Sequence, residues 1–141
     1  MPDTAFELDP RLAADTFLVG DLALSRVLLI NDAAYPWLLL VPRRRGVCEI
    51  TDLGHIERAH LMTEITQAAD ALKAETTCDK LNIAALGNVV SQLHVHVIAR
   101  SQHDPAWPRP VWGHAAPMPY GDKAANEILV RLRRRLWFTK A

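Results

Sequence analysis

Hydrophobic and polar residues alternate with a strict period of two between Gln92 and Ile98, in the order Gln-Leu-His-Val-His-Val-Ile. Alternate side chains of a β-strand leave the same face. The pattern therefore predicts a strand over residues 89–100 with an apolar face toward the core. The polar face would carry Gln92, His94 and His96. Two imidazoles and an amide in a row on one strand face indicate where to look for function.

The same reading of periodicity predicts the other strands. They are expected at residues 16–19, 24–30, 37–41 and 80–86. Gly20-Asp21 is expected to form the turn between the first two strands. The run 37–41 is continuously apolar, which is typical of a central strand covered on both faces, and Pro42 ends it.

Two longer stretches have helical periodicity. One runs from a cap at Thr51 or Asp52 to about Glu75, and the other covers residues 122–136. A single helical turn is expected at residues 10–15. The Pro-rich stretch 104–119, which contains Trp107 and Trp112, is expected to be irregular.

Composition narrows the class of protein. The chain has 141 residues, a length typical of one domain, and half of them are hydrophobic. Its 16 basic and 16 acidic residues balance, which argues against nucleic acid or a membrane surface as the partner. There is no signal-peptide pattern and no apolar run of the ~18 residues that a spanning helix needs. Cys48 and Cys78 do not make a disulfide framework, so we expect a cytoplasmic protein.

Three interpretations of the paired histidines are open. They could be structural core residues, although the opposite strand face already supplies the apolar contacts. They could bind zinc, but a catalytic zinc needs a third protein ligand, and no residue nearby has the spacing to supply one. The third interpretation, nucleophilic catalysis by an imidazole, is favoured because histidine titrates near neutrality and forms covalent intermediates.

With these residues the chain resembles the histidine triad superfamily of nucleotide hydrolases and transferases. The family motif is His-φ-His-φ-His-φ-φ, where φ is apolar, and here it is the range Gln92–Ile98. Gly87-Asn88 before the motif, Asn31 after a strand, and the strand ending at Pro42 also resemble the family pattern. The likeness covers about residues 16–108 and is greatest to short bacterial members that resemble diadenosine polyphosphate hydrolases.

The resemblance implies a role for each matching residue. His94 matches the nucleophile that attacks the α-phosphorus of a nucleotide, and His96 matches the histidine that contacts phosphate oxygens. Asn88, with Gly87, matches the region near the α-phosphate, and Asn31 matches the ribose contact, with Asp32 as the fallback.

The sequence also departs from the family at two places. Gln92 replaces the first histidine of the motif, and Trp37 stands where the family often has another histidine. These two family positions are neighbours, so the changes could be coupled. An amide forms hydrogen bonds but carries no proton charge. Arg43, Arg44 and Arg45 are expected to form a solvated basic loop, with contact to a polyphosphate as the alternative.

The whole pattern implies one α+β domain over residues 1–141. We expect an antiparallel sheet of about five strands, one long helix, and a C-terminal extension (104–137) that consists of the Pro-rich segment and a last helix. The implied activity is hydrolysis of a nucleotide phosphoanhydride or phosphoramidate through a nucleotidyl-histidine, with no cofactor or metal. The alternatives are nucleotidyl transfer and a non-catalytic nucleotide-binding homodimer. In a homodimer, the Pro-rich segment and last helix could make the contact between subunits.

Overall fold

A computed structural model describes residues 5–138 of the chain. Five antiparallel strands form one sheet in the order β1-β2-β3-β5-β4. They are β1 (Thr16–Asp21), β2 (Ser25–Ile30), β3 (Trp37–Pro42), β4 (Lys80–Ala84) and β5 (Val95–Arg100). The helices are α1 (Pro10–Ala14), the long α2 (His55–Glu75) and the C-terminal α3 (Asp122–Arg133), with a 3₁₀ turn, η1 (Ile50–Asp52), before α2. The expected α+β fold is confirmed.

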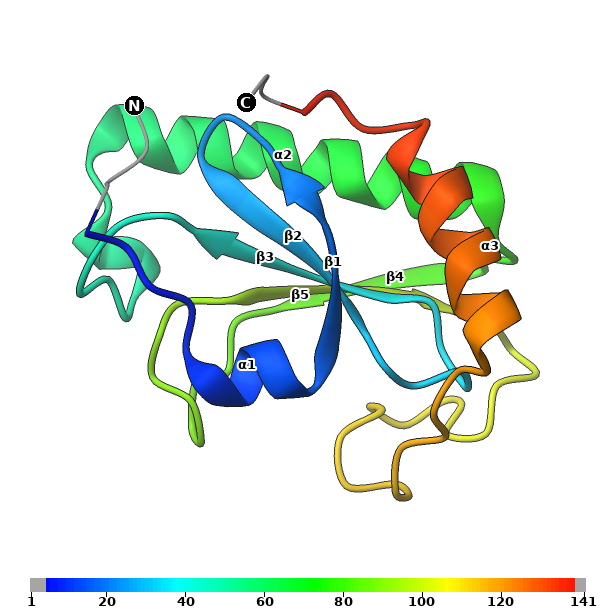
Figure 1. Cartoon of the computed structure of the whole chain (residues 1–141). Coiled ribbons are helices and arrows are strands. Elements are labelled where there is room, and N and C mark those ends of the chain that lie inside the picture. The colour runs from blue at the N-terminus through cyan, green and yellow to red at the C-terminus, as the bar shows by residue number, and fades with distance from the viewer. Residues whose placement is uncertain (1–4, 139–141) are drawn as a thin grey trace.

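The sheet has a different cover on each face (Figure 1). Helix α2 lies along one face, and α3 packs against α2 and β1. Helix α1 and the irregular segment 101–120 lie on the opposite side of the sheet. Because side chains alternate along each strand, the two faces form two separate apolar clusters.

The α2 side holds the larger core. The apolar stripe of α2 is fully buried, with Leu61 and Leu72 at 2% and 0% exposure. It packs on Leu38, Leu40, Val95 and Val97 from the two central strands. The stripe on α3 joins the same cluster through Leu129 and Leu132. All six residues of β3 are buried, as the continuous apolar run predicted.

The turn between β1 and β2 was predicted at the wrong residues. Gly20 and Asp21 belong to β1, and the chain reverses at residues 22–24 instead. Gly20 is needed for a close approach rather than for a turn, since an added Cβ would lie 2.5 Å from the Phe138 ring. Close approach of another group is a common reason for glycine inside a strand.

The start of the long helix also differs from the prediction. Its N-cap is Gly54, not Thr51 or Asp52. The Asp52 carboxylate accepts the backbone N–H groups of Cys48 and Glu49, at 3.1 and 2.9 Å. These bonds close the η1 turn and lower the pKa of Asp52, because they stabilise the charged form.

The basic run after β3 is only partly solvated. Arg43 is buried and donates to the carbonyl oxygens of Leu22 and Ala23, so it holds the β1–β2 turn. Arg44 pairs with Glu57 on α2. Both side chains are thus used in holding the fold, and the expectation of a fully solvated loop was wrong for Arg43.

Candidate active site

Two adjacent strands bring the aromatic side chains of the candidate site together. Trp37 of β3 pairs with Ile98 of β5, and Leu39 pairs with His96. Cross-strand partners share a face, so Trp37 and His96 are diagonal neighbours, a separation that large aromatic rings can bridge. Both lie on the face opposite α2, together with the smaller apolar cluster.

His94 is oriented by the chain just before it. Its Nδ1 lies 2.7 Å from the backbone carbonyl oxygen of Gln92. A carbonyl oxygen only accepts, so Nδ1 carries the proton and donates it, which leaves the lone pair on Nε2. The ring is buried, with 7% of the residue exposed. His94 therefore presents Nε2 as a nucleophile or a general base.

His96 is held from the other side by tryptophan. The indole N–H of Trp37 lies 3.0 Å from Nδ1 of His96, and both residues are buried. The His94 and His96 rings lie edge to face, with centroids 5.0 Å apart. Burial first, and then the neighbouring His94, lower the pKa of His96 from 6.5 to about 4. His96 is therefore neutral at physiological pH.

Gln92 is not part of a three-residue strand face. Strand β5 begins at Val95, and residues 85–94 form the connection from β4. The Gln92 amide bonds the N-terminal segment: Oε1 accepts from the Asp9 N–H at 2.8 Å, and Nε2 donates to the Glu7 carbonyl at 2.9 Å. A strand over 89–100 was thus wrong for its first six residues. The backbone N–H of Leu93 bonds the Val47 carbonyl, which is not in a neighbouring strand, and the side chain of Gln92 bonds the N-terminal segment.

Gln92 and Trp37, whose replacements were expected to be coupled, form hydrogen bonds with different parts of the chain. Trp37 bonds His96, whereas Gln92 bonds residues 7 and 9. Each replacement therefore serves a different part of the site. The N-terminal segment had carried no functional prediction, since nothing in its local pattern identifies Gln92 as its partner.

The three predicted nucleotide contacts lie in the connections that follow strands β2 and β4. Asn31 follows β2, and its Oδ1 accepts the Tyr120 N–H at 2.8 Å. Asp32 is buried and accepts the backbone N–H groups of Ala34 and Met118. Gly87 has a positive φ of 69°, and with the exposed Asn88 it belongs to the β4–β5 connection that leads to His94.

Trp112 was not predicted as a site residue, but the structure places it against His96. Their ring centroids are 5.0 Å apart, and Trp112 also meets Trp37 at 5.9 Å. The segment 101–120 that carries it is anchored by Arg100. This buried side chain bonds the Asp104 carboxylate at 2.7 and 3.0 Å and the Arg109 carbonyl at 2.8 Å. The sequence feature that could have identified this contact was the presence of tryptophans in the Pro-rich stretch.

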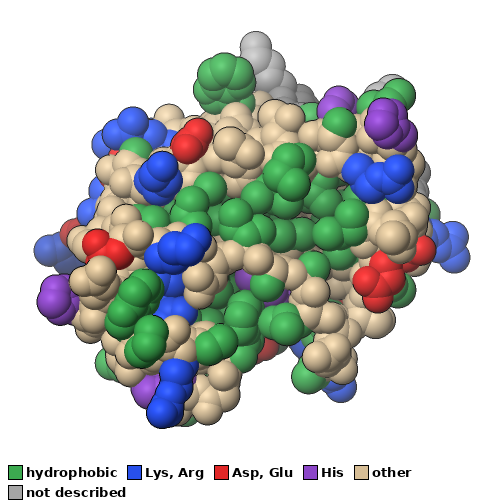
Figure 2. Space-filling view, turned by 180° about the vertical axis from the view of Figure 1, so that it is seen from behind, with side chains coloured by type: hydrophobic (Ala, Val, Ile, Leu, Met, Phe, Trp, Pro, Cys, Tyr) green, Lys and Arg blue, Asp and Glu red, His purple; other side chains and the backbone are tan. Residues whose placement is uncertain are grey.

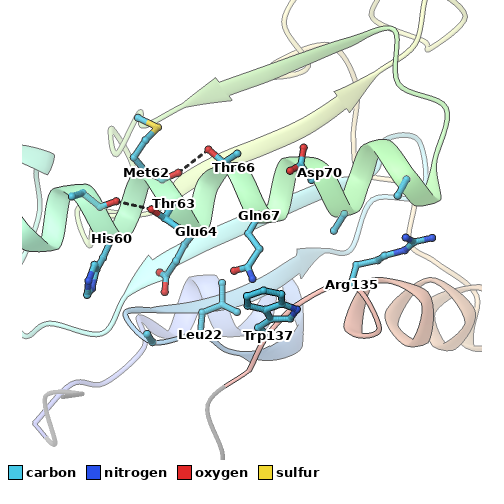
Figure 3. Close-up of a pocket in the computed structure, with 14 residues that line it drawn as sticks. Leu22, His60, Met62, Thr63, Glu64, Thr66, Gln67, Asp70, Arg135 and Trp137 are labelled. Atoms are coloured by element: carbon cyan, nitrogen blue, oxygen red, sulfur yellow. Dashed lines mark hydrogen bonds between the residues drawn. The ribbon is translucent and has the colours of Figure 1, made fainter.

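Two cavities differ in their relation to this site. The larger, an open groove of about 1150 Å³, lies along α2 beside Leu22 and the exposed Trp137 (Figure 3). None of the predicted site residues lines it. The smaller, about 260 Å³, is lined by Gln92, Ser91, residues 7–10 and residues 46–48. Open space therefore borders the Gln92 side chain where that side chain bonds the N-terminal segment.

Two further findings concern the described part of the chain. Among residues 5–138, no three or more His, Cys, Asp or Glu side chains gather as they would to hold a metal ion. Over the same residues, no helix has the length and apolar character to cross a membrane.

Comparison with known proteins identifies the family. A family model described as the HIT domain matches residues 11–103. The chain therefore belongs to the histidine triad family, as the motif around His94 indicated. No curated protein matches the chain.

Solved structures of similar length support this assignment. A histidine triad protein from Bradyrhizobium japonicum is 56% identical, with a TM-score of 0.92 over 94% of this chain and 99% of that one. One from Sinorhizobium meliloti 1021 is 43% identical, with a TM-score of 0.92 over 94% and 98%. One from Marinobacter aquaeolei VT8 is 44% identical, with a TM-score of 0.90 over 93% and 96%.

Proposed function

We propose that the protein hydrolyses a phosphoanhydride or phosphoramidate bond of a purine nucleotide, such as a diadenosine polyphosphate, through a nucleotidyl-histidine on His94. The observation that carries the proposal is the 2.7 Å hydrogen bond between His94 Nδ1 and the Gln92 carbonyl, which leaves the nucleophilic lone pair on Nε2. The bond uses the backbone of Gln92, so it does not depend on a histidine at position 92.

The reaction has two displacements at phosphorus. The Nε2 lone pair of His94 bonds to the α-phosphorus, and the bond to the leaving oxygen or nitrogen breaks with its electron pair, after which the leaving group takes up a proton. Water then attacks the phosphorus, the N–P bond breaks, and its electrons return to Nε2. One proton of that water is released with the nucleoside monophosphate. His96 contacts the phosphate oxygens, and Asn31, Gly87 and Asn88 bind the nucleotide.

The test is chromatographic detection of AMP after incubation with diadenosine tetraphosphate and, separately, with adenosine phosphoramidate. His94→Ala is expected to abolish AMP release while nucleotide binding largely remains. His60→Ala is a matched control, because His60 is an exposed histidine on α2, where it lines the groove that contains none of the predicted site residues (Figure 3). Turnover by His94→Ala at the parent rate would exclude His94 as the nucleophile.

A second candidate function is a nucleotide-binding module without catalysis. It is favoured by the side chain of Gln92, which bonds the N-terminal segment where the family motif has a histidine. This candidate predicts no AMP from either substrate, with AMP binding intact by calorimetry. Transfer to an acceptor other than water would instead give a nucleotidyl adduct on His94, detected by mass spectrometry, with little AMP released in water alone.

We further propose that the protein is a homodimer that joins along β4. This strand is at the edge of the sheet, and an unpaired strand edge is a template for another chain. Ile83 on β4 is 48% exposed, and Met62 on the β4 side of α2 is 61% exposed (Figure 3). Figure 2, which shows the molecule from behind the view of Figure 1, has hydrophobic side chains gathered near its centre.

The alternative contact is the one expected from the sequence, through the Pro-rich segment and the last helix. The segment 101–120 and α3 pack on their own chain. Light scattering over a broad concentration range is expected to give twice the 15.7 kDa chain mass, and Ile83→Lys to give the chain mass alone. A parent protein that stays monomeric would exclude the dimer.

A further inference from the structure

Trp37 and His96 form a pair in which only one direction of hydrogen bonding is possible. The indole N–H is a donor with no acceptor nitrogen, so the 3.0 Å contact requires a lone pair on Nδ1 of His96. A neutral imidazole with its lone pair on Nδ1 carries its proton on Nε2. The two histidines are thereby held in opposite tautomers, since His94 carries its proton on Nδ1.

We propose that Trp37 is a positioning residue of this site, which holds His96 as the neutral Nε2–H tautomer so that it offers a hydrogen-bond donor beside the nucleophilic Nε2 of His94. The role in the reaction rests on the proposed function. In that reaction the Nε2–H of His96 donates to a non-bridging phosphate oxygen. One ring then supplies the lone pair that attacks, and the other supplies the N–H that stabilises the charge on phosphate.

The surroundings of His96 favour the same state. Its ring meets Trp37, Trp112 and His94, with centroids 5.7, 5.0 and 5.0 Å away. The two indoles carry no charge, so among these three neighbouring rings His94 is the titratable one. A protonated His96 would also carry a hydrogen on Nδ1, and this N–H would point at the indole N–H of Trp37. The hydrogen bond from Trp37 therefore disfavours protonation of His96. Burial and His94 act in the same direction, in keeping with the lowered pKa of His96.

Tryptophan at position 37 holds His96 in one protonation state, which a histidine at this position would not do. A histidine at position 37 could donate or accept, and it would titrate near neutrality, so the state of His96 would change with pH. The indole N–H has no titration in the physiological range and no alternative tautomer. Trp37 is itself fixed by its place on the central strand β3 and by an edge contact with Tyr35.

The direct test uses nitrogen NMR of the unmodified protein. The spectra are expected to show His96 with an unprotonated Nδ1 and a protonated Nε2 at pH 7. They are also expected to show a coupling across the hydrogen bond from the Trp37 indole to His96 Nδ1. A protonated Nδ1 on His96 at pH 7 would overturn the proposal, and this measurement requires no variant.

Trp37→Phe then removes the N–H and keeps an aromatic ring. We expect His96 to become a mixture of tautomers with a higher pKa, and kcat to fall by about 10- to 100-fold with a smaller change in KM. Trp112→Phe is the matched control, because Trp112 contacts His96 through its ring only. It should leave the tautomer of His96 unchanged. An unchanged tautomer and titration in Trp37→Phe would overturn the role of Trp37.

The spectra also separate this inference from the proposed function. They report the state of His96 whether or not any nucleotide is hydrolysed. The expected tautomer without AMP release would contradict the hydrolase and retain the Trp37–His96 pairing. AMP release that depends on His94, with the other tautomer on His96, would contradict the pairing and retain the hydrolase.

Discussion

The Nε2 of Gln92 donates a 2.9 Å hydrogen bond to the carbonyl oxygen of Glu7, across 85 positions of the sequence. Its Oε1 accepts from Asp9 two residues further on. The side chain at the first motif position thus anchors the N-terminal segment. At the same time, its backbone carbonyl orients His94. Side chain and backbone of one residue therefore have separate tasks, and this separation leads to two predictions.

Gln92→Ala is expected to release the N-terminal segment. Two hydrogen bonds are lost at a partly exposed position, so the free energy of unfolding should fall by about 1–2 kcal/mol. Hydrogen exchange at the Asp9 amide should rise more than exchange in the sheet. Gln102→Ala serves as the control, because Gln102 is exposed and uses its backbone N–H to bond Asp79. Equal exchange at Asp9 in both variants would contradict the attachment.

Gln92→His is expected to loosen the same segment while AMP release persists at the parent rate or faster. The carbonyl at position 92 is backbone, so it continues to accept from Nδ1 of His94. The measurement is kcat for diadenosine tetraphosphate together with exchange at Asp9. A loss of turnover as severe as in His94→Ala would mean that the amide side chain takes part in the reaction.

The lowered pKa of His96 makes stability depend on pH. The folded state holds this ring neutral down to about pH 4, whereas the unfolded chain protonates it near the ordinary value of 6.5. The unfolded state therefore binds more protons in this range, and stability falls as the pH falls from 6.5 toward 4. The shift corresponds to about 3 kcal/mol.

Urea unfolding at pH 7.5 and at pH 4.5 measures this effect. Other groups titrate as well, so the relevant quantity is the difference between the parent and His96→Gln, which lacks the titrating ring. The variant should lose less stability than the parent between the two pH values. Parallel losses in the two proteins would show that His96 titrates normally in the fold.

Asp104→Ala is expected to destabilise the protein strongly. Arg100 is 1% exposed, and its charge pairs with the Asp104 carboxylate at 2.7 Å. Removing the carboxylate leaves a buried guanidinium without its ion partner, which typically costs about 3–5 kcal/mol. The segment that carries Trp112 should loosen with it, because Asp104 also accepts the backbone N–H groups of Ala106 and Trp107.

The control for this prediction is another pair with the same spacing. Lys123 and Glu127 are also four positions apart, but Lys123 is 91% exposed and the pair spans 3.8 Å. Glu127→Ala should change the unfolding free energy by no more than ~0.5 kcal/mol, because exposed pairs on a helix contribute little. Comparable losses from the two variants, measured by urea unfolding, would contradict the importance of burial at Arg100.

The sequence by itself determined most of the local elements and which face the side chains of a formed strand occupy, but not every boundary. Alternation around Val95 and Val97 placed them in the core and placed His96 on the other face, since side chains of a strand alternate. The apolar run 37–41 identified the central strand, and the family motif identified the two histidines. Periodicity carries this information because it depends on residues within a few positions of one another.

Only the tertiary structure decided which groups bond these side chains. The Trp37–His96 bond joins residues 59 positions apart, and Trp112 reaches the same ring from the Pro-rich segment. Gln92 turns to Glu7 and Asp9 because α1 and its preceding segment lie on that side of the sheet. A local pattern specifies the face from which a side chain leaves, but the segment that covers that face is set by packing of the whole chain.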